Sequence, residues 1–299
     1  MEIIVTGANG FLGKYIVKAL VNKNNLKSLS RTSGDYQVSL ENEVPNFEQK
    51  FDLVVHAAGK AHSIPSTAEE KQQFHDVNVL GTLNFLKGFE KVGLPEQFVF
   101  ISSISVYGQE YGIEITEEYQ LKAKDAYGLS KIEAEVLVME WCKKYNVVCT
   151  ILRLPLLVGK NPPGNLGAMI KAIDKGYYFN IGGGKARKSM VLAEDVASFI
   201  PKVAAIGGTY NLTDGINPDF KELSRVISKQ RNKKMPFNLP LFIAKIMGYT
   251  GDLLGDKAPI NSSKIKKITS DLTFDDSKAR ELLGWNPKSV LDYLKNNNL

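Results

Sequence analysis

The chain has 299 residues, of which 43% are hydrophobic and 23% charged, proportions that suit a globular protein of one large domain or two fused units. No apolar run reaches the roughly 20 residues that cross a bilayer, so we expect no transmembrane segment. The opening "MEIIVTGANG" leaves no room for a signal peptide, and Cys142 and Cys149 lack metal-ligand spacing. We therefore expect a cytoplasmic protein with both cysteines reduced and buried, and no metal site.

The net charge of +6 is unevenly distributed along the chain. Residues 220–299 hold 15 Lys and Arg against 8 Asp and Glu, whereas residues 1–219 hold 23 against 24. This surplus fits a solvated basic face, which would bind nucleic acid or anionic lipid weakly. The surplus of positive charge fits equally well a lobe that binds an anionic substrate, and composition alone does not decide between these two interpretations.

The first thirty residues read as strand, glycine turn, helix and second strand. "EIIVTG" predicts a buried parallel strand, and "KYIVKALVNK" has the apolar face of a helix. Between them, Gly7 allows a tight turn, Gly10 lets the backbone approach a pyrophosphate, and Gly13 permits close packing of helix on strand. The free N–H groups of the helix would bind the phosphates of a dinucleotide. The expected cofactor contacts in this turn are Gly7, Asn9, Gly10, Phe11, Leu12 and Gly13.

The end of the second strand, "SLSRTSGDY", predicts which dinucleotide binds. Arg31 follows Gly13 by 18 residues, where a ribose contact is expected, and the first acidic residue of this segment is Asp35. A guanidinium there would pair with a 2′-phosphate, which a carboxylate would repel. We therefore predict NADP, with NAD as the alternative because NAD can bind without the acidic residue.

Further strands follow in "DYQVSL", "FDLVVHAAG" and "FVFISSISVYG", alternating with helical segments. Such alternation predicts an α/β fold with a Rossmann-type, doubly wound parallel sheet.

A serine, a tyrosine and a lysine form the candidate catalytic group. Ser103 follows the strand 98–101, Tyr127 comes 24 residues later, and Lys131 lies four residues beyond it in a helical segment. That spacing places both side chains on one helix face. A phenol with a pKa near 10 is a poor base, but a nearby ammonium lowers that pKa. Tyr127 would then exchange the proton of a sugar hydroxyl while hydride moves to or from nicotinamide, Ser103 would hold the same oxygen, and Lys131 would bind the nicotinamide ribose.

These motifs together resemble a family. "TGANGFLG", "HAAG", "VNVLGTLNFL", "SSISVYG", "YGLSK" and "RLPLLVG" are similar to the extended short-chain dehydrogenases/reductases (the NAD-dependent epimerase/dehydratase family) that act on nucleotide sugars. The resemblance assigns catalysis to Ser103, Tyr127 and Lys131. It also implies that Ala57, Ala58, Gly59 and Pro155 line the cofactor. Asn78 matches a polar residue that the family has in a helix near the site, but a hydrogen bond inside the helix explains an asparagine there equally well.

The resemblance further implies a division into two parts. Residues 1–165 would form the NAD(P)-binding Rossmann domain, with a return segment near 189–213. Residues 166–188 and 214–299 would form a smaller carboxy-terminal substrate-binding lobe. A homodimer through the helix of Tyr127 is also expected.

The residues after Ser103 reduce the number of reactions that the chain could catalyse. The family's dehydratases have an Asp-Glu pair there, whereas this chain has Ile104 and Ser105, which argues against dehydration. Two reactions remain: NADPH-dependent reduction of a 4-keto sugar, and 4-epimerisation of the UDP-glucose/UDP-GlcNAc type with bound NAD. Arg31 favours reduction, and the later segments are similar to enzymes of polysaccharide synthesis. We therefore predict reduction at C4 of a UDP-linked 4-keto-6-deoxy-hexosamine.

Several residues are candidates for substrate contacts. By resemblance, Asn165 would contact the nucleotide, and either Arg187 or Lys188 would neutralise the pyrophosphate unless it is a solvated loop charge. Weaker candidates are Lys60, His62, Lys264, Lys266 and Lys267. The apolar stretch "LPLFIAKIMGYTGDLLG" would form a helix over the sugar site or at a membrane surface, and we expect it to serve core packing.

Two other classes of function compete. A non-catalytic NADP-binding regulator is possible on this fold, but such proteins commonly lose the tyrosine or the lysine. A nucleic-acid-binding role would depend on the basic tail alone, so we expect no nucleic-acid partner.

Overall fold

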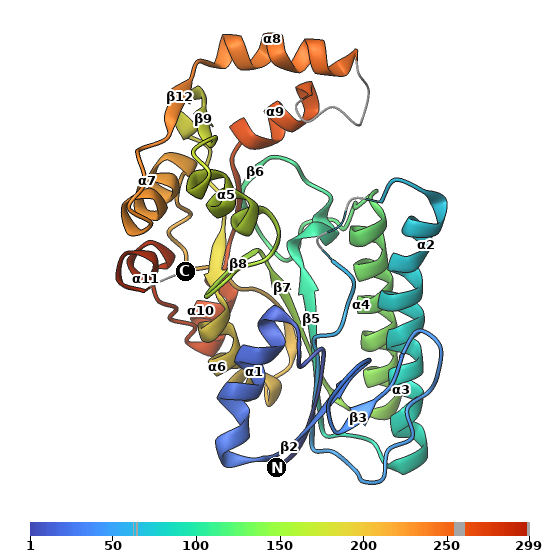
Figure 1. The fold of residues 1–299 in the computed structure, drawn as a ribbon. Coiled ribbons are helices and arrows are strands. Elements are labelled where there is room, and N and C mark those ends of the chain that lie inside the picture. Colours follow the sequence, from blue (N-terminus) through green and yellow to red (C-terminus); the bar gives the residue numbers. More distant parts are fainter. Residues whose placement is uncertain (62, 64, 254–260, 298–299) are drawn as a thin grey trace.

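The computed structural model describes residues 1–61, 63, 65–253 and 261–297. Its centre is a parallel sheet of seven strands with helices on both faces (Figure 1). From edge to edge these are β11 (Gly208–Asn211), β7 (Val148–Leu154), β5 (Gln97–Ser103), β4 (Leu53–His56), β1 (Glu2–Thr6), β2 (Asn25–Ser30) and β3 (Tyr36–Gln37). The chain order reverses between β1 and β4, as in a Rossmann-type sheet, which confirms the predicted α/β class.

The central strands are buried on both faces, which explains their continuous apolar runs. β4 is buried throughout, and only the first residue of β5 is partly exposed. β5 is longer than predicted, since it extends to Ser103 rather than ending at Ile101. The third predicted strand is shorter than "DYQVSL", because only two residues of it pair with β2.

Helices cover the two faces of the sheet in separate groups (Figure 1). α1 (Phe11–Leu20) and α6 (Ala193–Ala204) pack on one face and against each other. On the other face lie α3 (Gly81–Val92) and α4 (Ala126–Tyr145), with α2 (Ala68–His75) beside α4. Cys142 of α4 is buried as expected, whereas Cys149 on β7 is half-buried; both are free thiols.

The later part of the chain builds a second core beside the sheet. α5 (Gly164–Asp174), α7 (Phe220–Gln230) and α11 (Val290–Asn296) surround this core. Its short parallel pairs are β8 (Leu156–Val158) with β10 (Met190–Leu192), and β9 (Phe179–Ile181) with β12 (Phe237–Leu239). β11 then returns to the main sheet beside β7. The predicted domain limits at 165, 189 and 213 stay a prediction.

Three further helices complete the chain. α8 (Leu241–Asp252) and α9 (Ser262–Thr269) lie at one end of the molecule, and α10 (Ser277–Leu283) lies near β11 (Figure 1). β13 (Leu272–Phe274) pairs with β6 (Gly112–Ile115), which follows β5 in the chain. Among the described residues, no helix combines the length and the apolar character needed to span a membrane.

Candidate cofactor and substrate site

The turn between β1 and α1 can be built only with glycine at two positions. Gly7 has φ +67°, and a Cβ on it would lie 2.7 Å from the Ala58 nitrogen. A Cβ on Gly13 would overlap the Gly7 carbonyl group. These contacts bring α1 and the loop after β4 tightly onto the end of β1, as the glycine spacing predicts.

The amino terminus of α1 has the features of a phosphate site. Gly10 is its N-cap, and α1 has no side-chain cap. A Cβ on Gly10 would meet only the Gly7 oxygen, at 3.1 Å, so its outer side is open. The positive end of the helix dipole and the N–H groups of Phe11, Leu12 and Gly13 are therefore available to an anion. This arrangement fits the pyrophosphate of a dinucleotide.

The loop after β2 is organised around Asn9. Its side-chain amide donates hydrogen bonds to Ser30 Oγ and Ser33 Oγ, each at 2.9 Å. Arg31 is 68% exposed, and its guanidinium lies 3.6 Å from the Glu41 carboxylate. The Ser30 and Ser33 hydroxyls thus lie beside the glycine turn, and Arg31 lies between these two serines in the sequence.

Asp35 is directed away from the end of β2. Its carboxylate accepts hydrogen bonds from Ser28 N at 2.8 Å and from Ser28 Oγ at 2.9 Å. These bonds lower the pKa of Asp35, against the effect of its partial burial. The carboxylate of Asp35, the acidic residue nearest in sequence to Arg31, is therefore hydrogen-bonded to Ser28 in the middle of β2.

Ser103, Tyr127 and Lys131 come from the carboxyl end of β5 and the first turns of α4. Asp125 caps α4 by accepting a hydrogen bond from Gly128 N at 3.0 Å, which sets where the helix begins. Tyr127 and Lys131 then lie one turn apart, as predicted. Ser103 and Lys131 are buried, and Tyr127 is half-buried.

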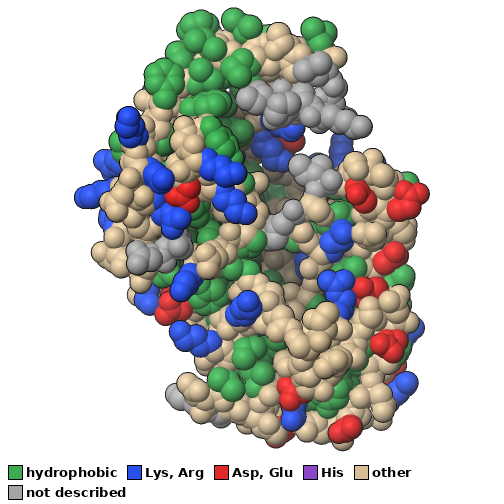
Figure 2. All heavy atoms as spheres, viewed as in Figure 1, with side chains coloured by type: hydrophobic (Ala, Val, Ile, Leu, Met, Phe, Trp, Pro, Cys, Tyr) green, Lys and Arg blue, Asp and Glu red, His purple; other side chains and the backbone are tan. Residues whose placement is uncertain are grey.

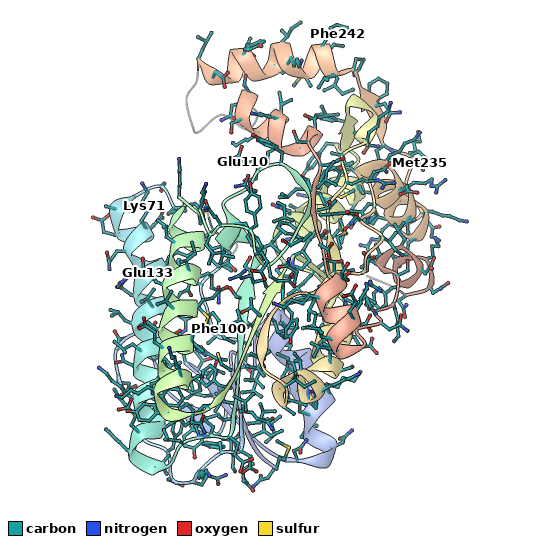
Figure 3. All side chains as sticks on the ribbon, turned by 180° about the vertical axis from the view of Figure 1, so that it is seen from behind. Lys71, Phe100, Glu110, Glu133, Met235 and Phe242 are labelled. Atoms are coloured by element: carbon teal, nitrogen blue, oxygen red, sulfur yellow. The ribbon has the colours of Figure 1, made fainter. Side chains whose placement is uncertain are left out.

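The Lys131 ammonium lies beneath the loop that follows β4. Its Nζ donates to the Ile101 carbonyl at 2.8 Å and lies 4.5 Å from the centre of the Phe100 ring, a residue labelled in Figure 3. A Cβ on Gly59 would be 3.5 Å from this Nζ. Burial lowers the pKa of Lys131 to about 8, and the Glu135 carboxylate opposes that shift. The "HAAG" loop and Lys131 are therefore neighbours.

The expected lowering of the Tyr127 pKa by Lys131 is wrong for this structure. The pKa of Tyr127 is raised because burial disfavours the phenolate, and the interaction with Ser103 only partly opposes the shift. Lys131 directs its ammonium to the Ile101 carbonyl. The phenol is accordingly protonated at neutral pH.

Asn78 has the role of a positioning residue. It lies in η2 (Asp76–Leu80), a π-helical turn, and is buried. Its Oδ1 accepts from Lys60 N at 2.7 Å, and its Nδ2 donates to Ser130 Oγ at 2.9 Å. It thereby ties the loop after β4 to α4 next to Lys131.

The remaining candidates are spread over the second core and the loops beside it. Pro155 is buried between β7 and β8, and Asn165 is exposed in the first turn of α5, which has no side-chain cap. Lys60 Nζ donates to Gln73 Oε1 at 2.8 Å. His62 lies outside the described residues.

Arg187 and Lys188 differ in their surroundings. Arg187 is exposed, whereas Lys188 Nζ donates to the carbonyls of Lys267 and Ser270 at 3.1 and 2.9 Å. Burial and the like charge of Lys267 lower the pKa of Lys188 to about 8. Of the weaker candidates, Lys266 lies 5.3 Å from the centre of the Tyr111 ring, and Lys264 and Lys267 lie on the same helix, α9.

Sequence reasoning missed a buried polar network directly behind the site. Glu135, one turn after Lys131, pairs with Arg153 of β7, and Ser102 donates a hydrogen bond to it. The spacing of Glu135 from Lys131 was a usable signal, because residues four apart share a helix face.

Comparisons with known proteins agree with this architecture. Two curated relatives match nearly the whole chain at 28% identity. One is an N-acetyl-alpha-D-glucosaminyl-diphospho-ditrans,octacis-undecaprenol 4-epimerase from Escherichia coli O157:H7, with 93% of this chain and 88% of the relative covered. The other is a UDP-glucose 4-epimerase from Vibrio cholerae, with 97% and 92% covered.

A solved structure of UDP-glucose 4-epimerase from Thermotoga maritima superimposes with a TM-score of 0.76 at 22% identity, covering 99% of this chain and 96% of that one. The family model described as the NAD dependent epimerase/dehydratase family matches residues 3–212. That match covers more than half of the chain and includes the glycine turn, Ser103, Tyr127 and Lys131. The protein is therefore an NAD(P)-dependent enzyme, and the chain belongs to the NAD dependent epimerase/dehydratase family.

Proposed function

We propose that this enzyme uses NADPH to reduce the C4 keto group of a UDP-linked 4-keto-6-deoxy-hexosamine, in the cytoplasm, for the synthesis of a surface polysaccharide. The broader assignment, a nucleotide-sugar 4-epimerase or reductase, is supported by the UDP-glucose 4-epimerase from Vibrio cholerae and by a GDP-6-deoxy-D-mannose reductase from Pseudomonas aeruginosa that is 30% identical over 47% of this chain. The choice of NADPH and of reduction depends on one observation, the arrangement at the end of β2.

That arrangement favours a phosphorylated ribose. Arg31 and the Ser33 hydroxyl can donate hydrogen bonds to a phosphate, whereas the Ser30 hydroxyl donates to the Ser33 carbonyl and the Asp35 carboxylate is held by Ser28. The Arg31–Glu41 contact, at 3.6 Å and with Arg31 largely in solvent, contributes little to stability, and Arg31 would exchange it for a 2′-phosphate dianion.

The residues that would hold the cofactor are those of the glycine turn and the loop after β4. The first turn of α1 would bind the pyrophosphate, Ala57, Ala58 and Gly59 would line the nicotinamide half together with Pro155, and Lys131 would bind the ribose hydroxyls. The bound cofactor supplies the hydride.

Tyr127 supplies the proton in this proposal. Its raised pKa keeps the phenol protonated at neutral pH, the form required to donate a proton to the C4 oxygen during reduction. Ser103 would donate a hydrogen bond to the same oxygen.

The substrate diphosphate would lie near the second core. Exposed Arg187 can approach it, and the uncapped amino terminus of α5, with Asn165 in its first turn, offers further N–H donors. Lys188 is the weaker of the two neighbouring cations for this purpose, because two backbone carbonyls already hold its ammonium.

A second candidate is 4-epimerisation with tightly bound NAD. It is favoured by the two 28%-identical relatives described above, since both are named as 4-epimerases. Either enzyme would dimerise through α4, where Leu129, Val136 and Met139 are exposed.

The deciding experiment is to denature the purified protein and identify any nucleotide released, then to titrate the empty protein with NADPH and NADH. We expect an empty site that binds NADPH at least about tenfold more tightly, a ratio that Arg31→Ala should reduce toward one. Arg225→Ala, at an exposed arginine of α7, is the matched control. Stoichiometric NAD carried through purification would support the epimerase instead. NADPH binding without turnover of any 4-keto sugar nucleotide would indicate a non-catalytic regulator.

A further inference from the structure

α8 packs on the rest of the molecule through small residues. Ala244, Gly248 and Gly251 are buried and lie at helical spacing along one side of it. A Cβ on Gly248 would be 2.6 Å from Ile265 Cδ1, so α8 and α9 are in close contact at this point. This side of α8 has no space for large side chains.

The large apolar side chains of α8 are on the opposite side. The apolar face of α8 consists of Phe242, Ile246 and Tyr249 together with Leu253, which directly follows the helix, at spacings of four, three and four residues. They are 65%, 59%, 66% and 87% exposed. A helix that serves a protein core buries its large apolar stripe, so the expectation of core packing for this segment is wrong. Figure 3 shows Phe242 directed outward at the end of the molecule.

The segment leading into α8 extends this surface. Met235 is 56% exposed and Phe237 is 71% exposed. Figure 2 shows hydrophobic side chains gathered over the end of the molecule that α8 occupies, with lysine and arginine side chains beside them. Exposed aromatic and large aliphatic groups in one place usually mark an interaction surface.

Lys245 lies on α8 next to Ile246, and Lys233 and Lys234 precede Met235 in the segment that leads into α8. Lys233, Lys234 and Lys245 are exposed, and none of them forms an ion pair within the described part of the chain. The acidic residue of α8, Asp252, is turned toward α9, where it accepts from Ser262 N at 3.0 Å and from Ser262 Oγ at 2.6 Å. The surface is therefore apolar in its centre and cationic at its edge.

We propose that α8 lies on an anionic phospholipid bilayer, with Phe242, Ile246, Tyr249 and Leu253 at the boundary of headgroups and acyl chains. An interfacial helix combines an apolar face with flanking Lys or Arg, and each lysine near an anionic surface adds attraction. Pairing of α8 with α8 of a second copy would instead bring the same lysines together. The basic surplus of residues 220–299 disfavours that arrangement and suits a negatively charged surface. This inference is independent of the cofactor and reaction proposed above.

Co-sedimentation of the full-length protein with vesicles tests the proposal. We expect binding to phosphatidylcholine vesicles containing about 30% phosphatidylglycerol, and about tenfold weaker binding to phosphatidylcholine alone. Raising NaCl from about 0.1 to about 0.5 M should weaken the binding, because salt screens the lysines. The double variant F242S/I246S and the double variant K233E/K234E should each lower the affinity about tenfold or more.

Matched controls separate this face from general surface effects. I206S/L282S changes two exposed aliphatic residues, one just after α6 and one on α10, and K87E/K91E reverses two exposed lysines of α3; both should bind vesicles like the wild type. Absence of binding to anionic vesicles would overturn the proposal, as would equal losses in the controls. The proposal would also be overturned if the wild type is a dimer that binds no vesicles and F242S/I246S is a monomer, because the apolar face of α8 would then join two copies of the chain.

Discussion

Glu135 and Arg153 form a two-point ion pair in the interior, one helical turn beyond Lys131. Arg153 Nε lies 3.1 Å from Oε1 of Glu135, and its Nη2 lies 2.8 Å from Oε2. Both residues are at most 5% exposed. A buried charge without a partner destabilises the folded state, so the Glu135 carboxylate and the Arg153 guanidinium each require the other.

The pair also connects α4 to β11 and to the β6–β13 strand pair. Arg153 Nη1 donates to the Tyr107 hydroxyl, which donates to Asn211 Oδ1 at 2.7 Å. Asn211 in turn donates to the carbonyls of Ile115 and Asp275, next to the paired strands β6 and β13. α4, β7, β11 and the β6–β13 pair are thus joined by one hydrogen-bonded network.

Glu135→Gln should therefore be strongly destabilising. Removing the carboxylate leaves Arg153 buried without a counter-charge, at a cost of about 3 to 5 kcal/mol in the free energy of unfolding. Urea denaturation measures this loss. Asp174→Asn, which breaks the partly exposed Asp174–Arg231 pair, is the control and should cost less than about 1 kcal/mol. Similar losses in the two variants would contradict the role given to burial.

Tyr127→Phe should abolish turnover and leave nucleotide binding intact, because it removes the proton donor and keeps the ring. The expected fall in the rate of NADPH oxidation is about 10²-fold or more. Tyr119→Phe, at an exposed tyrosine, is the control. Normal activity of Tyr127→Phe would refute the assigned mechanism.

Two glycine substitutions should separate folding from cofactor binding. Gly13→Ala introduces a Cβ that overlaps the Gly7 carbonyl group, so we expect a loss of several kcal/mol in stability. Gly10→Ala places its Cβ 3.1 Å from the Gly7 oxygen, a tight contact that a small shift relieves, so this variant should fold while binding NADPH more weakly. Thermal unfolding and NADPH titration of both variants test this. Full NADPH affinity in Gly10→Ala would argue against pyrophosphate at this turn.

His56 should make the fold sensitive to acid. Its Nδ1 accepts from the Thr6 hydroxyl at 2.6 Å, and its Nε2 contacts Thr82 Oγ1 at 2.9 Å; the Thr82 hydroxyl already donates to Asn78 O, so Nε2 carries the proton. Burial and the charge of Lys131 lower the pKa of His56 to about 3, against 6.5 for an ordinary histidine.

Between these pH values the unfolded chain binds a proton that the folded chain does not, so stability falls as the pH falls. The slope from this residue is about 1.4 kcal/mol per pH unit. His56→Gln should remove that part of the slope between about pH 6 and pH 4, whereas His75→Gln, at an exposed histidine, should retain it. An unchanged slope in His56→Gln would show that other groups control acid unfolding.

The parts of the fold that depend on local spacing could be predicted from the sequence. Gly7, Gly10 and Gly13 act within one turn, and Tyr127 and Lys131 lie on one helix, so both groups are visible as short patterns. Local spacing places Glu135 on the helix face of Lys131, but it does not identify Arg153, on a separate element, as the partner of Glu135.

The direction in which a side chain points was harder to predict than which residues belong to a helix or a site. An apolar stripe at helical spacing is the same pattern whether it faces a core or solvent, and only the buried Ala244, Gly248 and Gly251 show which side of α8 packs. In the same way, the ammonium of Lys188 and the carboxylate of Asp35 are oriented by partners that lie elsewhere in the chain.

The pairing of β6 with β13 constrains how this protein could be recombined with its relatives. β6 belongs to the segment between Ser103 and Tyr127, yet its strand partner lies some 160 residues later, and Glu114 N donates to Thr273 Oγ1 at 2.9 Å. A chimera made by a single crossover near residue 165 would join β6 from one parent to β13 from another. Exchange of substrate specificity would therefore succeed only if both strands are transplanted together.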